Sequence, residues 1–223
     1  MCKARPIAGH KNNAEMGVNM TVIYKIISIL FRMKYKRHLK GEGKVFIDPR
    51  LCHFVFGEKS SINLNGNLKM GANAYGNNGR SNLLRMDDGA VLDVNGNFKF
   101  MYGADVVIFP NGHLVLGNNS FINSDCKIRC HKNIVIGDDC AISHDCIIMD
   151  SDAHYLEGDN HTKDVVIEDK VWIGSRVTVL SGSRIGTGSV IAAGSVVNGD
   201  IPEYSLAAGI PARVIRMDVK WER

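Results

Sequence analysis

Residues 167–200 read IEDKVWIGSRVTVLSGSRIGTGSVIAAGSVVNGD, and this stretch carries an aliphatic residue at every sixth position. Those residues are Ile167, Ile173, Val179, Ile185, Ile191 and Val197. A small residue follows most of them four places on, as at Val177, Ser183, Ser189 and Ser195. Neither a helix, with its period of about 3.6, nor an alternating strand, with its period of 2, predicts this spacing. A coil with three flat faces does, because each face uses about six residues.

The same period continues upstream of residue 167. It appears as Leu116, Ile122, Ile128 and Ile134, slips by two residues, and resumes as Ile136, Ile142 and Ile148. Shorter traces lie earlier, at Ile62, Leu68 and Ala74 and at Leu92 and Phe98. We therefore predict an all-β solenoid over 59–201, whose coils bury their aliphatic corners against one another. Tight turns of positive φ are expected at the glycines that follow corner residues: Gly117, Gly137, Gly174 and Gly186.

One segment, residues 149–166 (MDSDAHYLEGDNHTKDVV), interrupts the repeat and is rich in Asp and His. A loop inserted into a solenoid usually projects from one face, and that face is often where ligands bind. We therefore expect the functional residues near this loop.

Charge and cysteine usage narrow the class of protein. The net charge of +4 is too small to indicate a nucleic-acid partner. Cys126, Cys140 and Cys146 each lie four residues after an aliphatic corner, so we expect buried, reduced thiols there. The chain has neither an apolar run of about 20 residues nor a secretory cleavage pattern, which favours a cytoplasmic location.

The N-terminal part, residues 1–58, is expected to be an extension of the solenoid domain. Residues 1–17 look unstructured, and a helix is predicted over 18–40, with an apolar face of Val22, Ile23, Ile26, Ile27, Leu30 and Met33. A basic cluster overlaps its end: Arg32, Lys34, Lys36, Arg37 and Lys40. We expect the helix to cap the open end of the solenoid. The alternative is attachment of this segment to the inner face of the membrane through the basic cluster.

The carboxy-terminal motifs resemble a known family. VWIGSRVTVLSGSRIGTGSVIAAGSVV followed by DIPEYSLAAGIPARVIR is similar to the signature of hexapeptide-repeat acyltransferases. The likeness covers residues 114–217 and is closest to maltose and galactoside O-acetyltransferases and bacterial exopolysaccharide O-acetyltransferases. It implies a left-handed parallel β-helix, a homotrimer with active sites between subunits, acetyl-coenzyme A as co-substrate and no metal. It also implies that residues 202–223 form a C-terminal extension that contacts the coenzyme.

The resemblance assigns roles to single residues. The motif SDAHY puts His154 at the family's catalytic histidine, and FIN puts Asn123 at an asparagine that lines the acceptor site. The positions that contact the coenzyme are matched by Ser175, Ala193, Arg213 and Arg216. In one departure, Asn198 and Gly199 stand where relatives often carry Thr-Lys, so one cation is missing near the coenzyme phosphates.

The chemistry asks little of the enzyme, since a thioester is already activated. One base that removes the proton of a sugar hydroxyl during attack is sufficient, and a neutral histidine suits this role. We assign it to His154, with Ser175 as a donor to the developing oxyanion. The group that orients His154 is left open between Asp152, Glu157 and a backbone carbonyl.

Other functions are weighed beside this acetyl transfer to a sugar or polysaccharide hydroxyl. The same base would serve N-acetylation of an amino or nucleotide-linked sugar, or O-acetylation of an antibiotic. A zinc carbonic anhydrase would draw on His113, His131, His144, His154 and His161, but no two have the four-residue gap that such enzymes use. A non-catalytic trimeric scaffold would need neither His154 nor the two arginines. His131 and His144, within the repeats, are expected to be structural or to face another subunit.

Overall fold

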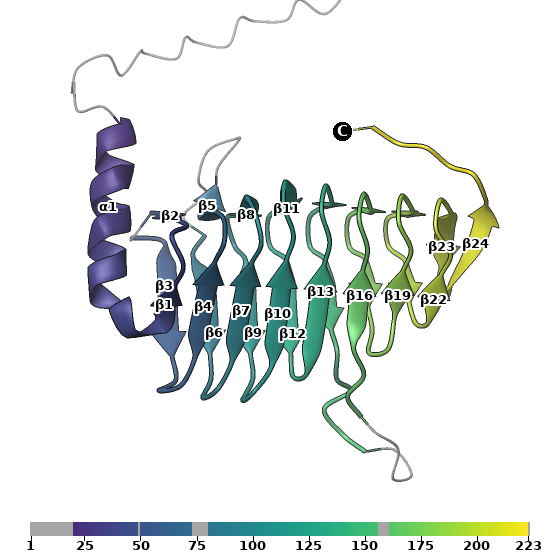
Figure 1. Ribbon diagram of the computed structural model, residues 1–223. Helices are drawn as coiled ribbons and strands as arrows, with labels where there is room; N and C mark the ends of the chain where they lie inside the picture. The colour runs from purple at the N-terminus through teal and green to yellow at the C-terminus, as the bar shows by residue number, and fades with distance from the viewer. Residues whose placement is uncertain (1–19, 49, 73–79, 156–160, 223) are drawn as a thin grey trace, which may run out of the picture.

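The computed structural model describes residues 20–48, 50–72, 80–155 and 161–222 (Figure 1). The predictions for residues 1–17, Ala74 and Glu157 lie outside these ranges. Within them the chain winds into a three-sided prism whose long axis runs across Figure 1, with one helix at its N-terminal end.

Each side of the prism is one sheet. Sheet A contains β1 (Leu39–Lys40), β4 (Ser61–Leu64), β7 (Val91–Val94), β10 (His113–Leu116), β13 (Asn133–Ile136), β16 (Val165–Ile167), β19 (Arg184–Ile185) and β22 (Asp200–Ile201). Sheet B contains β2 (Val45–Ile47), β5 (Leu68–Ala72), β8 (Phe98–Met101), β11 (Ser120–Ile122), β14 (Ala141–Ile142), β17 (Trp172–Ile173), β20 (Val190–Ile191), β23 (Leu206–Gly209) and β24 (Ala212–Arg216). Sheet C contains β3 (Cys52–Phe56), β6 (Asn82–Met86), β9 (Asp105–Ile108), β12 (Lys127–Cys130), β15 (Ile147–Met149), β18 (Thr178–Val179) and β21 (Val196–Val197).

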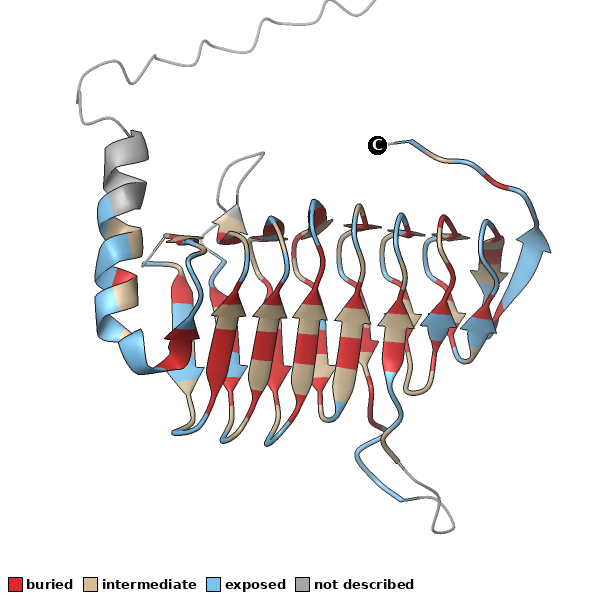
Figure 2. Cartoon of the chain, viewed as in Figure 1, coloured by how far each residue is buried: buried red, intermediate tan, exposed pale blue. Residues whose placement is uncertain are grey.

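The strands of neighbouring coils pair in parallel, and the period of six sets their register. In sheet B, Ile142 pairs with Ile173 and Ile173 with Ile191, and all three side chains are fully buried. Figure 2 shows the buried residues as a continuous band inside the coils. Within the described ranges, the predicted aliphatic residues of the repeat are buried as expected, and most pair with an apolar residue of the next coil.

The glycines after the corners serve a different purpose from the one predicted. Gly117, Gly137, Gly174 and Gly186 do not have positive φ. Their role is close approach between coils, since a Cβ built on Gly174 would lie 2.6 Å from the backbone nitrogen of Ala193. The left-handed conformation falls two positions later, for example at Arg176 (φ 58°) and Gly188 (φ 71°).

Coil formation begins earlier than residue 59, where the sequence placed the start of the solenoid. Strands β1, β2 and β3 lie between Leu39 and Phe56 and pair with β4, β5 and β6. Leu39 and Val45 keep the six-residue spacing and pair with Ile62 and Leu68, so the repeat extends to this first coil.

Helix α1 (Met20–Lys34) caps this first coil and ends before residue 40, where a short 3-10 helix (Lys36–His38) leads into β1. Its buried face overlaps the predicted one only at Ile27. Phe31 is buried against Phe54, with ring centroids 4.8 Å apart, and Ile27 and Tyr35 are partly buried against the core. The predicted face residues Ile26, Leu30 and Met33 are exposed instead, and the side chains of Val22 and Ile23 lie outside the described part.

The opposite end of the prism is closed by a hairpin. Strand β24 pairs antiparallel with β23 after a cis peptide bond between Ile210 and Pro211. The chain then turns back over the coils, where the Trp221 indole nitrogen donates to the Lys170 carbonyl at 2.8 Å. Both ends of the stack are therefore covered.

Two further observations concern the cysteines and the membrane. Cys126, Cys140 and Cys146 are buried free thiols, as predicted. Among the described helices, none has the length and apolar character needed to cross a bilayer.

Candidate active site

Three of the six predicted site residues gather at the edge where sheet B turns into sheet C. Backbone hydrogen bonds align this corner from coil to coil: Asp145 N to Ser124 O (3.0 Å), Arg176 N to His144 O (2.8 Å) and Gly194 N to Ser175 O (2.9 Å). We call the aligned residues Ser124, His144, Ser175 and Ala193 the corner column. Ser175 and Ala193, both predicted coenzyme contacts, thus occupy adjacent coils.

Asn123, the predicted acceptor residue, lies beside the top of the corner column. Its backbone nitrogen donates to Ile142 O at 2.8 Å, and its side-chain Oδ1 accepts from Ser124 N at 2.9 Å. The side chain is half-buried and its orientation is set by this local bond. The structure therefore brings Asn123, Ser175 and Ala193 to one edge of the prism.

His144, which the sequence predicts to be structural or to face another subunit, belongs to the corner column. Its Nδ1 lies 2.6 Å from the hydroxyl of Ser124, which is buried. The sequence contained a signal for this position. His144 follows Ile142 by two residues, as Ser175 follows Ile173 and Ala193 follows Ile191. His131, by contrast, stacks on Phe109 with ring centroids 3.7 Å apart, on another edge.

The inserted loop has a firmly held root. Asp150, fully buried, accepts three backbone N–H bonds, from His131 (2.6 Å), Lys132 (2.8 Å) and Asn133 (2.7 Å). The two limbs of the loop pair as a short ribbon, with Asp152 N donating to His161 O at 2.8 Å. These bonds fix the direction in which the loop leaves the prism.

His154 lies on this loop with an exposed side chain. Within the ranges that the structure describes, its ring makes no hydrogen bond, so neither Asp152 nor a backbone carbonyl of those residues orients it. The next residue, Tyr155, packs edge-on against His161 at 4.2 Å. His154 is therefore presented to the outside of the protomer.

The loop and the corner column lie on opposite edges of sheet C. Strand β15 (Ile147–Met149) connects them, and the backbone from His144 to Asp150 can span at most about 20 Å at about 3.3 Å per extended residue. In Figure 1 the loop leaves the lower edge of the prism, whereas sheet B forms its upper side. One chain therefore does not bring its own His154 to its own Ser175.

The two arginines of the C-terminal hairpin both lie on the outer face of sheet B. Arg213 pairs with Ala208 and Arg216 with Leu206, which flank the buried Ala207. Since β23 runs toward the sheet C side, Arg213 is on the side of the corner column and Arg216 is on the far side. Arg213 thus continues the direction set by Ser175 and Ala193.

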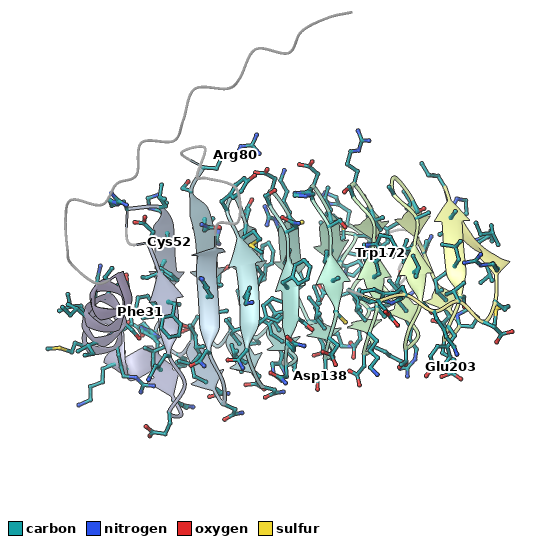
Figure 3. The ribbon with its side chains drawn as sticks, turned by 90° about the horizontal axis from the view of Figure 1, so that it is seen from above. Phe31, Cys52, Arg80, Asp138, Trp172 and Glu203 are labelled. Atoms are coloured by element: carbon teal, nitrogen blue, oxygen red, sulfur yellow. The ribbon has the colours of Figure 1, made fainter. Side chains whose placement is uncertain are left out.

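A cavity of about 360 Å³ lies on the outer face of sheet B, near the N-terminal coils. Its lining contains cations, amides and aromatic rings but no carboxylate: Phe46, Asn67, Lys69, Asn97, Phe98, Lys99, Asn119, Ser120 and Phe121. Phe46, Lys69, Lys99 and Phe121 form one column across four strands, because each pairs with the next. Asn123 lies two residues beyond Phe121, so the cavity leads toward the corner column. Figure 3, which looks down on this face, shows Trp172 farther along it and Arg80 at the corner-column edge.

The carbonic anhydrase alternative requires three metal ligands close together. Over the described ranges, no three His, Cys, Asp or Glu side chains come together as a metal site.

Comparison with known proteins agrees with the architecture. The family described as bacterial transferase hexapeptide (six repeats) matches residues 164–199. A polysialic acid O-acetyltransferase of Escherichia coli O1:K1 / APEC is 34% identical over 126 residues, covering 53% of this chain and 41% of that protein. WbbJ of Escherichia coli K12, named as a lipopolysaccharide biosynthesis O-acetyl transferase, is 32% identical over 144 residues, covering 58% and 73%.

Two further likenesses extend this result. The galactoside O-acetyltransferase of Escherichia coli K12 is 34% identical over 123 residues, covering 52% of this chain and 56% of that protein. The crystal structure of the polySia-specific acetyltransferase NeuO superposes with a TM-score of 0.52 at 25% identity, covering 83% of this chain and 88% of that one. This chain spans about two fifths of the polysialic acid O-acetyltransferase and about half of the galactoside O-acetyltransferase.

The chain belongs to the hexapeptide-repeat acetyltransferase family. The predicted fold class, a left-handed parallel β-helix, and the predicted family are thereby confirmed.

Proposed function

We propose that the protein transfers the acetyl group of acetyl-coenzyme A to a hydroxyl of a sugar in a glycan. His154 of one copy would act at the corner column of a neighbouring copy in a homotrimer. The observation that carries this proposal is that the loop root and the corner column lie on opposite edges of sheet C, joined by strand β15. A second copy supplies the missing half, and a closed threefold ring supplies it to every site.

The reaction needs one proton relay. His154 takes the proton of the acceptor hydroxyl as its oxygen attacks the thioester carbon, and the C–S bond then breaks. The coenzyme leaves as a thiolate and receives that proton back from the imidazolium, so the products are an acetyl ester and free coenzyme A. Ser175 is the proposed donor to the oxyanion of the tetrahedral intermediate.

The coenzyme would follow the corner column toward the C-terminal hairpin. Ser175 is the proposed contact of the thioester end, Ala193 that of the pantetheine arm, and Arg213 and Arg216 those of the phosphate end. Arg213 is exposed and lies on the same side of sheet B as the column, so a phosphate can reach it without crossing the sheet. Binding depends more heavily on these arginines because Asn198 and Gly199 supply no cation.

The acceptor would enter through the cavity on sheet B. Lys69 and Lys99 offer positive charge and hydrogen-bond donors, and Phe46 offers a face on which a sugar ring packs. Three relatives carry the names of polysialic acid, lipopolysaccharide or galactoside acetyltransferases, which supports a saccharide acceptor. Asn123 would bind the acceptor where the cavity meets the corner column. We place this activity in the cytoplasm, where acetyl-coenzyme A is made.

The test is complementation between two inactive variants. His154→Ala removes the base, and Ala193→Trp fills the exposed coenzyme path without touching the core. Each homotrimer is expected to be inactive with acetyl-coenzyme A and a panel of glycan acceptors, with free thiol as the measurement. Mixed trimers, refolded or co-expressed at equal amounts, should recover about a quarter of wild-type turnover, because about a quarter of their sites pair two intact halves.

Three results would contradict the proposal. If the mixed trimers stay inactive, His154 and Ala193 of the same chain belong to one active site. Full activity of His154→Ala would show that His154 is not the base. A monomer in solution would show that no site is shared between copies. His161→Ala, on the same loop, is the control for a general effect of altering the insertion.

A further inference from the structure

Helix α1 has two apolar faces, and only one of them is used in the fold. Phe31 packs into an aromatic cluster with Tyr35 (4.8 Å between centroids) and Phe54 (4.8 Å), and Tyr35 reaches Phe56 at 4.9 Å. Figure 3, which views the helix end-on, shows Phe31 on the side that faces the first coil. This face explains the cap over the open end of the stack.

The opposite face is apolar and exposed. Ile26, Ile29, Leu30 and Met33 are 52%, 60%, 58% and 70% exposed. At about 100° per residue they fall within an arc of roughly 100°, centred roughly 150° from Phe31. Four large apolar side chains on one exposed stripe are more than scattered surface residues explain.

The borders of this stripe are positively charged. Arg32 and Lys34 lie on the two sides of the arc, and Lys36, Arg37 and Lys40 follow directly. The sequence from Met20 to Gly41 contains no Asp or Glu. None of these lysines forms an ion pair within the described ranges, and the Lys34 ammonium lies over the Tyr35 ring at 5.0 Å.

We propose that this exposed stripe of α1 docks the protein on an anionic lipid bilayer. An apolar face bordered by Lys and Arg is the pattern of helices that lie in the membrane interface, where acyl chains take the apolar side chains and lipid phosphates take the cations. A second copy packed end to end is disfavoured, because it would bring two acid-free basic clusters together.

The orientation of the helix fits this partner. In Figure 1, α1 lies across the end of the prism, so its outer stripe faces away along the prism axis. In the proposed trimer, with its threefold axis along the prisms, three such helices would share one flat end. Three weak contacts in one plane bind a surface much more tightly than one. This step rests on the proposed function, whereas the charge and exposure of the single helix do not.

Vesicle flotation of the full chain tests the proposal. The probes are vesicles of phosphatidylcholine alone and vesicles that also contain phosphatidylglycerol, each at low and at high salt. We expect the protein to float with the anionic vesicles at low salt, with at least tenfold less bound on neutral vesicles or at high salt. The double substitution Leu30→Glu, Met33→Glu should lower binding at least tenfold and leave acetyl transfer to a soluble acceptor unchanged.

The matched control is Val55→Glu, which adds a charge at a residue that is 52% exposed on β3 of the same coil. It should bind vesicles like the wild type. Failure of the wild type to float would overturn the proposal, as would equal binding to neutral vesicles. Lipid-free assembly into double trimers, lost in Leu30→Glu, would assign the stripe to a second copy instead. Absence of acetyl transfer by the wild type would refute the proposed function but would not affect the interpretation of vesicle binding.

Discussion

Among single residues, His144 is the one whose importance the fold changes most. It lies between Ser124 and Ser175 in the corner column, and Ser124 bonds it at 2.6 Å. The Ser124 hydroxyl and His144 Nδ1 share one hydrogen bond, and either atom can donate in it, depending on the tautomer of the ring. In the tautomer in which the hydroxyl donates, Nε2 carries the ring proton and offers an N–H donor beside the proposed thioester path.

This arrangement leads to a kinetic prediction. His144→Ala should lower kcat at least about tenfold with little change in the KM for acetyl-coenzyme A, because a donor to developing charge is lost. His144→Gln, which keeps an N–H donor, should recover part of the loss. His113→Ala is the control, since His113 pairs with Asp93 at 2.8 Å on sheet A, away from the column. Equal losses in Ala and Gln variants would indicate a structural role.

At the scale of the elements, the cysteine side chains act as packing units between strands. Burial raises the pKa of Cys52 and of Cys140 to about 11, and it also raises the pKa of Cys130. At pH 8 a thiol with a pKa of about 11 is thiolate in only about one molecule in a thousand. Reactivity therefore falls for two reasons, a lack of thiolate and a lack of access.

The expected outcome is a native protein that resists thiol reagents. A Cys2→Ser variant, used because Cys2 lies outside the described residues, should show no fast labelling by a disulfide reagent at pH 8. In guanidinium chloride, all remaining thiols should react. Rapid labelling of the folded variant would contradict the buried positions of Cys52 and Cys140.

The elements also show where sequence reasoning succeeds and where it fails. The corners from Leu116 onward were predictable because each hexad packs on the next, so local spacing reports the contact. The buried face of α1 was not predictable, because Phe31 packs on Phe54, which lies in a strand that the period does not reveal. The distance between His154 and Ser175 was also hidden. This distance depends on which of the three edges of the prism each residue occupies. The phase slip near Ile134 and the unequal lengths of the coils prevent a reader of the sequence from assigning each residue to its edge.

Considered as a whole molecule, the prism is a stack whose coils stabilise one another. Ile173 is fully buried between Ile142 and Ile191 of the adjoining coils. Ile173→Ala should lower the free energy of unfolding by about 2–5 kcal/mol, because it leaves a cavity between two coils. Urea unfolding followed by circular dichroism measures this loss.

The control for this prediction is Val55→Ala, which removes an exposed apolar side chain and should change the free energy of unfolding by less than about 0.5 kcal/mol. A similar small effect at Ile173 would mean that the coils tolerate a gap, and the stack would then not be the unit of stability.

Because every coil adds the same rise, the number of coils sets the distance between the helix-capped end of the stack and any residue along it. In sheet B, five steps separate β2, beneath the helix, from β17, whose end carries Ser175. At about 4.8 Å per step, the proposed site of acetyl transfer lies roughly 24 Å above the end of the stack. With that end resting on a bilayer, the enzyme would modify a lipid-linked saccharide at a set height, past the sugars nearest the lipid. Inserting or deleting one coil of the protein would move the acetylated sugar outward or inward by about 4.8 Å. The number of coils would therefore decide which sugar of the saccharide is acetylated.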